Sequence, residues 1–208
     1  MPSESDKVGV AGQRALVMGA SGNVGACVTR HLVAGGADVR VLLRKSSSTK
    51  GIDGLDVERR YGDVFDTVDV AAAMSDRDVV YYCVVDTRAE LRDPAPLFRT
   101  NVEGLRNVLD VAAQANLQRF VFLSTIGTIA VGRYGETVDE DTPFNWADRA
   151  GSYIESRRSA ERLVLSLVDA HHLSPADLRE IEAKLAQPSS GAAESRPPHP
   201  GRRSRRKP

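Results

Sequence analysis

Three glycines at three-residue spacing, Gly19, Gly22 and Gly25, stand where a short apolar run gives way to a helical pattern. A residue without a Cβ lets the chain turn tightly and lets its backbone approach a pyrophosphate, while free N–H groups at a helix N-terminus attract the anion. The segment therefore predicts a phosphate-binding loop, with an ordinary strand-to-helix turn as the alternative. The expected buried stripe of the helix that follows consists of Val24, Cys27, Val28, His31 and Leu32.

Strand and helix patterns alternate along most of the chain. Strands are expected at residues 15–18, 39–43, 57–61, 79–85 and 120–123, and further helices at 68–74, 101–115 and 153–168. The run 79–85 is continuously apolar and rich in β-branched residues, which favours a central parallel strand buried on both faces. This alternation predicts an α/β fold with a doubly wound parallel sheet, in which ligands bind outside the carboxyl ends of the strands.

Composition indicates one domain without a dominant charge. The 208 residues are 41% hydrophobic, enough for one sizeable core, and 28 basic side chains balance 28 acidic ones. No global field therefore favours nucleic acid, a membrane or acidic substrates. Cys27 and Cys83 are expected to be small buried residues in a reducing compartment. The polar start and the lack of a long apolar span predict a cytoplasmic protein.

The two ends of the chain differ in character from its centre. We expect a flexible N-terminus over residues 1–12, one domain over 13–168, a short appended helix within 169–187 and a disordered basic tail rich in proline and arginine over 188–208. The cluster 201–208 can contact nucleic acid, but a solvated tail is favoured. The adjacent His171 and His172 lack a second ligand pair, so no metal site is expected.

Four motifs in a fixed order carry a resemblance to a known family. They are the glycine segment 19–25, Gly62-Asp63-Val64, the segment 101–107, and Ser124-Thr125 together with the segment 153–157. With these motifs, residues 13–168 resemble the N-terminal portion of an extended short-chain dehydrogenase/reductase, the superfamily of nucleotide-sugar epimerases, dehydratases and dihydroflavonol-type reductases. The resemblance implies a Rossmann-like domain. Most of the C-terminal substrate region of such enzymes is not recognisable in this sequence.

The resemblance also implies a set of cofactor-binding residues. Asp63 and Val64 are assigned to the adenine, where a carboxylate after a tight turn can accept from an exocyclic amine, although a solvated turn acid is an equal alternative. Arg44 ends the second strand, where relatives that prefer NAD place an acid. A guanidinium there suits a 2′-phosphate, which favours NADP over NAD; a solvated cation beside Lys45 is the alternative. The remaining cofactor-binding residues are Gly19, Ser21, Gly22, Asn23, Val24, Gly25, Asn101, Tyr153 and Arg157.

Catalysis is assigned by the same resemblance. Tyr153 is the expected general acid/base, and Thr125 is the expected donor to the substrate oxygen, with Ser124 able to substitute; either hydroxyl can instead cap the turn after its strand. A phenol titrates near 10 in water, so it needs a cation beside it to work near neutral pH. The family supplies a lysine four residues after the tyrosine, whereas this chain has Arg157. Arginine keeps the charge and can bind a ribose, but it does not release its proton.

These features lead to a principal hypothesis and to alternatives. The principal one is an NAD(P)-dependent oxidoreductase or epimerase-like enzyme for a small carbonyl or sugar-type substrate. The second is a catalytically impaired or truncated NADP-binding module with a redox-sensing or interaction role, and a nucleic-acid binder ranks last. Tyr134, between glycines, is expected to be a lid or surface residue. A homodimer contact is one use for four leucines that can instead face the sheet, namely Leu105, Leu109, Leu163 and Leu167.

Overall fold

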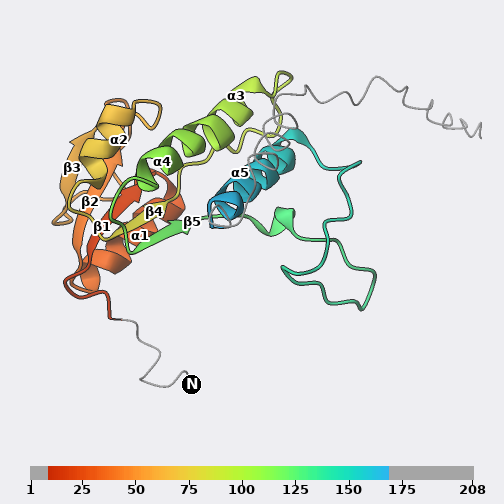
Figure 1. Ribbon diagram of the computed structural model, residues 1–208, viewed down its shortest axis with the longest axis horizontal. Helices are drawn as coiled ribbons and strands as arrows, with labels where there is room; N and C mark the ends of the chain where they lie inside the picture. The colour runs from red at the N-terminus through yellow and green to blue at the C-terminus, as the bar shows by residue number, and fades with distance from the viewer. Residues whose placement is uncertain (1–8, 169–208) are drawn as a thin grey trace, which may run out of the picture. The chain divides into compact units, whose positions relative to one another are not determined.

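Five parallel strands form one sheet in the order β3-β2-β1-β4-β5. The computed structural model describes residues 9–168, and the strands within them are β1 (Arg14–Met18), β2 (Asp38–Leu43), β3 (Glu58–Tyr61), β4 (Val79–Tyr82) and β5 (Arg119–Phe122). β1 is central, and the order runs outward from it in both directions (Figure 1). This confirms the doubly wound, Rossmann-like sheet expected from the sequence.

Helices make most of the connections between the strands. They are α1 (Asn23–Ala34), α2 (Thr67–Met74), α3 (Ala95–Phe98), α4 (Gly104–Ala112) and α5 (Ser152–Val168). A π-helical turn over Arg99–Glu103 joins α3 to α4, and a short 3-10 turn over Ile126–Thr128 follows β5. The helix expected at 101–115 thus begins earlier and ends at Ala112, while the strand expected at 79–85 ends at Tyr82.

The core lies around β1. Residues 15–18 of this strand are each 0% exposed, and the strand pairs with β2 on one side and β4 on the other. Burial of consecutive residues means that both faces of the strand are covered, as expected for a parallel sheet inside an α/β fold. Three of the four leucines considered for a dimer contact, Leu105, Leu109 and Leu163, are buried within this chain.

α1 packs against the sheet through a different face from the one that the hydrophobic pattern predicts. Its buried residues are Gly25, Ala26, Thr29 and Leu32, whereas Val24 is 47% exposed and Cys27 is exposed. The prediction of Val24, Cys27 and His31 as buried residues was therefore wrong, because all three are exposed. The helix starts directly against the glycine turn, so close backbone contact selects small side chains on its inner face instead of large apolar ones.

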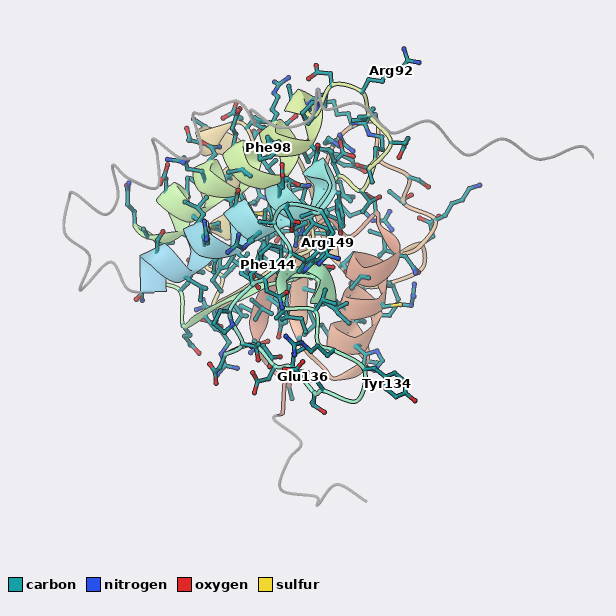
Figure 2. All side chains as sticks on the ribbon, turned by 90° about the vertical axis from the view of Figure 1, so that its right-hand side faces the viewer. Arg92, Phe98, Tyr134, Glu136, Phe144 and Arg149 are labelled. Atoms are coloured by element: carbon teal, nitrogen blue, oxygen red, sulfur yellow. The ribbon has the colours of Figure 1, made fainter. Side chains whose placement is uncertain are left out.

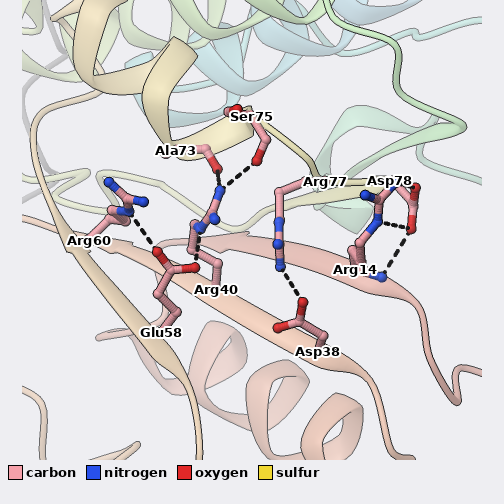
Figure 3. Close-up of polar contacts among 9 residues, drawn as sticks. All are labelled: Arg14, Asp38, Arg40, Glu58, Arg60, Ala73, Ser75, Arg77 and Asp78. Atoms are coloured by element: carbon pink, nitrogen blue, oxygen red, sulfur yellow. Dashed lines mark hydrogen bonds and ion pairs between the residues drawn. The ribbon is translucent and has the colours of Figure 1, made fainter.

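Three arginines, of which Arg40 and Arg77 are buried, form ion pairs at the amino edge of the sheet. Arg40, 6% exposed within β2, donates through Nε to Glu58 of β3 at 2.6 Å (Figure 3). Its Nη1 donates to the carbonyl oxygens of Ala73 and Ser75 at 2.9 and 2.6 Å, so the same guanidinium caps the end of α2. Two further pairs at this edge are Arg77 with Asp38 at 3.0 Å and Arg14 with Asp78 at 2.6 Å.

We expect the fold to lose stability in acid partly through Glu58. The hydrogen bond from Arg40 holds the pKa of Glu58 below its usual value of 4.5. A carboxyl group whose pKa is lower in the folded state contributes stability above its unfolded pKa, and that contribution is lost as the pH falls through the folded value. Urea unfolding near pH 7 and near pH 3 measures the loss. Glu58→Gln should shrink it relative to wild type, whereas Glu140→Gln, at an exposed carboxylate, should leave it unchanged.

Candidate functional site

The residues selected from the sequence follow the carboxyl ends of the strands. Because all five strands are parallel, the segments that leave these ends meet at one edge of the sheet. Gly19 follows β1, Arg44 follows β2, Asp63 comes shortly after β3, and Ser124 and Thr125 come shortly after β5. The tertiary structure therefore brings four separate segments of sequence to the same edge.

The turn between β1 and α1 requires glycine at two of its three positions. Gly19 has a φ of +86°, and a Cβ on it would lie 2.7 Å from the carbonyl carbon of Cys83 after β4. A Cβ on Gly25 would lie 2.2 Å from the carbonyl oxygen of Gly19. Gly22 is different, because its nearest neighbour would be 3.4 Å away, which is ordinary contact. The first and third glycines are thus needed for the fold, while the second leaves one side of the loop open.

The open side of this turn presents backbone donors. Gly22 is the N-cap of α1 and offers no side-chain cap to the helix, and its own N–H is taken by Gly19 at 3.0 Å. The first N–H groups of an α-helix have no partner inside the helix, and they carry the positive end of its dipole. Ser21, Asn23 and Val24 are exposed around them. This arrangement fits a pyrophosphate.

The loop that carries Asp63 is held by its neighbours. The Asp63 N–H donates to Asp69 Oδ2 at 3.0 Å, and Asp63 Oδ1 accepts from the N–H of Phe65 at 3.1 Å. Asn107 of α4 donates to the carbonyl oxygen of Val64 at 2.6 Å. The loop is therefore fixed, with the second carboxylate oxygen of Asp63 left to accept from a ligand. Asn107 lies in a motif noted in the sequence, but this contact could not be predicted because 43 residues separate its partners.

Arg44 is exposed at the end of β2. Its backbone N–H donates to Ser47 Oγ at 3.2 Å, while its guanidinium has no hydrogen-bond or ion-pair partner within residues 9–168. A free guanidinium at the carboxyl edge of the sheet is in a suitable place for a phosphate group. Whether it binds one is a prediction that the structure leaves open to test.

Asn101 is an internal brace. It is 0% exposed within the π-helical turn, and its Oδ1 accepts from the N–H of Asp86 at 2.7 Å. Its Nδ2 donates to the carbonyl oxygen of Asp86 at 2.9 Å and to Ser156 Oγ at 3.0 Å. Ser156 in turn donates to the carbonyl oxygen of Tyr153 at 2.8 Å. Direct cofactor contact by Asn101 remains a prediction; what its amide does here is tie the segment after β4 to the first turn of α5.

Thr125 and Tyr153 lie on neighbouring segments. Thr125 Oγ1 accepts from the N–H of Gly127 at 3.3 Å, so its own hydroxyl hydrogen is not used in that bond. The turn after Thr125 touches α5 closely, since a Cβ on Gly127 would come 2.3 Å from the Ile154 side chain. Ser124 instead donates to Glu161 Oε1 at 2.9 Å. Of the two hydroxyls expected from the sequence, only that of Thr125 remains available as a donor.

Arg157 is enclosed. It is 2% exposed, one Nη donates to the carbonyl oxygen of Leu123, and its guanidinium carbon lies 4.8 Å from the ring centre of Phe122. Nε and the other Nη find no partner among the residues that the structure describes. Burial lowers the pKa of Arg157, an effect that the nearby Tyr153 opposes. Burial likewise raises the pKa of the neighbouring Tyr82, whose hydroxyl also has no described partner.

Other residues noted in the sequence lie away from this edge or outside the described part. Tyr134 is fully exposed and points away from the fold (Figure 2). Within residues 9–168 there is no cluster of metal-ligating side chains and no helix long and apolar enough to cross a membrane. His171, His172, the appended helix and the basic tail fall outside the described residues, and so do most of the residues of the expected N-terminal segment.

Comparisons with known proteins agree with this fold. The model of the NAD dependent epimerase/dehydratase family matches residues 15–181. The chain is 34% identical over 120 residues to sterol demethylase protein B of Methylococcus capsulatus, covering 58% of this chain and 37% of that protein. It is 34% identical over 152 residues to the 4-hydroxy-2-methyl-3-oxo-4-farnesyl-3,4-dihydroquinoline-1-oxide ketoreductase of Stigmatella aurantiaca, covering 73% of this chain and 45% of that protein.

Solved structures show the same similarity. A short-chain dehydrogenase/reductase superfamily protein from Agrobacterium tumefaciens with bound NAD matches 72% of this chain and 43% of its own chain, at 28% identity and a TM-score of 0.59. This chain spans less than half the length of each of these three proteins. The similarity therefore covers the sheet and its carboxyl edge, with more than half of each relative lying beyond it.

Proposed function

Because the chain belongs to the NAD dependent epimerase/dehydratase family, we propose that it binds a nicotinamide dinucleotide and uses it in an oxidoreductase or epimerase reaction on a small carbonyl or sugar-type molecule. The glycine cradle between β1 and α1 is the observation that carries the proposal. Gly19 and Gly25 are required by close backbone contacts. Gly22, between them, leaves open the side on which the free N–H groups of the helix point outward. The positive end of the helix dipole on that side suits the charge of a pyrophosphate.

The adenine half of the cofactor would be held beside this cradle. Asp63, with one carboxylate oxygen not used by the loop, is placed to accept from the adenine amine, and Val64 supplies an apolar contact. Arg44 would bind the 2′-phosphate of NADP through charge-assisted hydrogen bonds. The segments that would carry these roles follow β1, β2 and β3, which are consecutive neighbours in the sheet.

Tyr153 and Thr125 would act on the substrate oxygen. The bound nicotinamide supplies or accepts hydride. Thr125 donates its unused hydroxyl hydrogen to the oxygen, and Tyr153 gives that oxygen a proton or takes one from it. When the proton leaves Tyr153, the positive charge of Arg157, four residues later on the same helix face, would stabilise the phenolate. Arg157 acts in this scheme through charge, because its guanidinium is enclosed and bound to β5.

Side-by-side titrations with NADPH and NADH test the proposal. The fluorescence of the reduced nicotinamide should change on binding, and NADPH should bind more tightly than NADH. If neither dinucleotide changes its fluorescence or stabilises the protein against heat, the proposed function is wrong at its first step.

Arg44→Ala should remove the preference for NADPH over NADH. Removing charge-assisted hydrogen bonds to a phosphate costs about 1.5–3 kcal/mol, so the dissociation constant for NADPH should rise by about tenfold or more. NADH, which lacks the phosphate, should bind as before. Lys50→Ala, at another exposed cation of the following loop, is the matched control and should leave both constants unchanged. Equal weakening of NADPH and NADH by Arg44→Ala would count against the assignment.

One observation favours the second candidate, an impaired binding module. The position four residues after the tyrosine holds a lysine in the family that the chain resembles, and here it holds Arg157. The guanidinium of Arg157 contacts Leu123 and Phe122 and does not release its proton. Such a module would bind dinucleotide with the affinity of an enzyme but would show no turnover with any carbonyl substrate.

A further inference from the structure

Three residues of α5 lie on one face of the helix, and two of them contact the residues at and just after the end of β5. Tyr153, Arg157 and Glu161 are spaced by four residues, which places them on one face of an α-helix and spreads them over roughly 12 Å of its length. Tyr153 is the proposed acid/base, and Arg157 is the cation beside it. Glu161 was not singled out from the sequence, although its spacing from Tyr153 could have shown that it shares this face.

Arg157 and Glu161 contact consecutive residues, 122–124, at and just after the end of β5. Arg157 lies over the ring of Phe122 and donates to the carbonyl oxygen of Leu123. Glu161 Oε1 accepts from Ser124 Oγ at 2.9 Å. These contacts join residues that are 34 and 37 positions apart in the chain. Each of them fixes the position of α5 along the direction of β5, and Thr125 is the next residue of that segment.

Glu161 also lies near a buried cation. Arg157 is almost fully enclosed, and Glu161 is one of the nearby groups that oppose the lowering of its pKa by burial. The hydrogen bond between Glu161 and Ser124 is the contact by which Glu161 draws α5 toward the segment that follows β5.

We infer that Glu161 is a positioning residue: through its hydrogen bond with Ser124 it fixes α5 on the end of β5 and so sets Tyr153 opposite Thr125. The inference rests on the proposed function, because Tyr153 and Thr125 matter only if a nicotinamide and a substrate bind between them. It also assigns different roles to the two neighbouring hydroxyls. Ser124 holds the helix, and Thr125 alone faces the substrate.

A comparison of the affinities for NADP⁺ and for ADP distinguishes a positioning role of Glu161 from a general loss of structure in its variants. ADP contains the adenine half and the pyrophosphate, and these contact the glycine cradle and the Asp63 loop in the proposed mode; the nicotinamide riboside, which ADP lacks, would lie along α5. Glu161→Ala should therefore raise the dissociation constant for NADP⁺ by up to about tenfold, because binding must then order α5 without the hydrogen bond from Ser124, and it should leave the constant for ADP unchanged. Glu161→Gln keeps an oxygen that accepts from Ser124 and should recover most of the affinity.

A double-mutant cycle tests the contact itself. Ser124→Ala should weaken NADP⁺ binding as Glu161→Ala does, and the double variant should be no worse than either single one. Glu155→Ala, at another carboxylate near the start of α5, is the matched control and should leave both ligands unaffected. Additive effects at Ser124 and Glu161, parallel loss of ADP and NADP⁺ binding, or wild-type NADP⁺ affinity in Glu161→Ala would each overturn the inference. A wild-type chain that binds ADP but no nicotinamide dinucleotide would instead overturn the proposed function, and coupling between Ser124 and Glu161 in urea unfolding would still report whether the bond exists.

Discussion

Gly25→Ala is expected to destabilise the protein and to abolish dinucleotide binding. The new Cβ would lie 2.2 Å from the carbonyl oxygen of Gly19, and both groups belong to backbone that cannot move aside without opening the turn between β1 and α1. Overpacking of this kind costs about 1–3 kcal/mol. Because the displaced backbone carries the N–H groups proposed to bind pyrophosphate, affinity should fall by more than about tenfold as well. Urea unfolding and fluorescence titration with NADPH measure the two effects.

Gly22→Ala is the informative partner of this variant. Its Cβ would meet the nearest atom only at 3.4 Å, so the fold should tolerate it. The methyl group would nevertheless occupy the open side of the loop, where the pyrophosphate is proposed to approach, so dinucleotide affinity should fall with little change in stability. Gly9→Ala, where a Cβ meets nothing within 4 Å, should alter neither quantity. Wild-type affinity in Gly22→Ala would show that the cradle does not bind the cofactor.

Tyr153→Phe is expected to produce the largest loss of turnover. General acid/base catalysis by a positioned side chain contributes about 10²–10⁴-fold to a rate, and phenylalanine keeps the ring while removing the hydroxyl group proposed to transfer the proton. Single-turnover oxidation of NADPH by any carbonyl compound that the wild type reduces should slow by that factor, with the dissociation constant for NADPH little changed. Tyr134→Phe, at a fully exposed position, is the control and should turn over normally.

The enzyme and the binding module differ in what Arg157→Lys does. If the wild type binds NADPH but reduces no carbonyl compound, a gain of turnover in Arg157→Lys would identify the buried guanidinium as the cause. Continued inactivity with intact binding would favour the module. Unchanged turnover in Tyr153→Phe, in a wild type that is active, would remove Tyr153 from the mechanism altogether.

Local chemistry made the glycine loop readable from the sequence. A positive φ at Gly19 and close backbone contacts at Gly19 and Gly25 both exclude a Cβ, so these positions require glycine. The glycines in the sequence therefore predict the turn directly. The same holds for the run 15–18, whose continuous apolar character follows from burial on both faces. The prediction of the buried face of α1 was wrong. Hydrophobic periodicity assigns large apolar residues to the buried face, whereas close packing of the helix on the turn placed the small residues Gly25, Ala26 and Thr29 there.

Residue types and their spacing determined the doubly wound sheet, the loop that fits a phosphate and the set of residues that would share one edge, because each depends on a few neighbouring positions. Only the tertiary structure decided what those residues contact. Asn101 became a brace between Asp86 and Ser156, Ser124 was bound by Glu161, and Arg157 turned in against β5. Partners such as Ser124 and Glu161 lie 37 residues apart, and a long side chain can point several ways from the same backbone position, so only packing in three dimensions selects one of them.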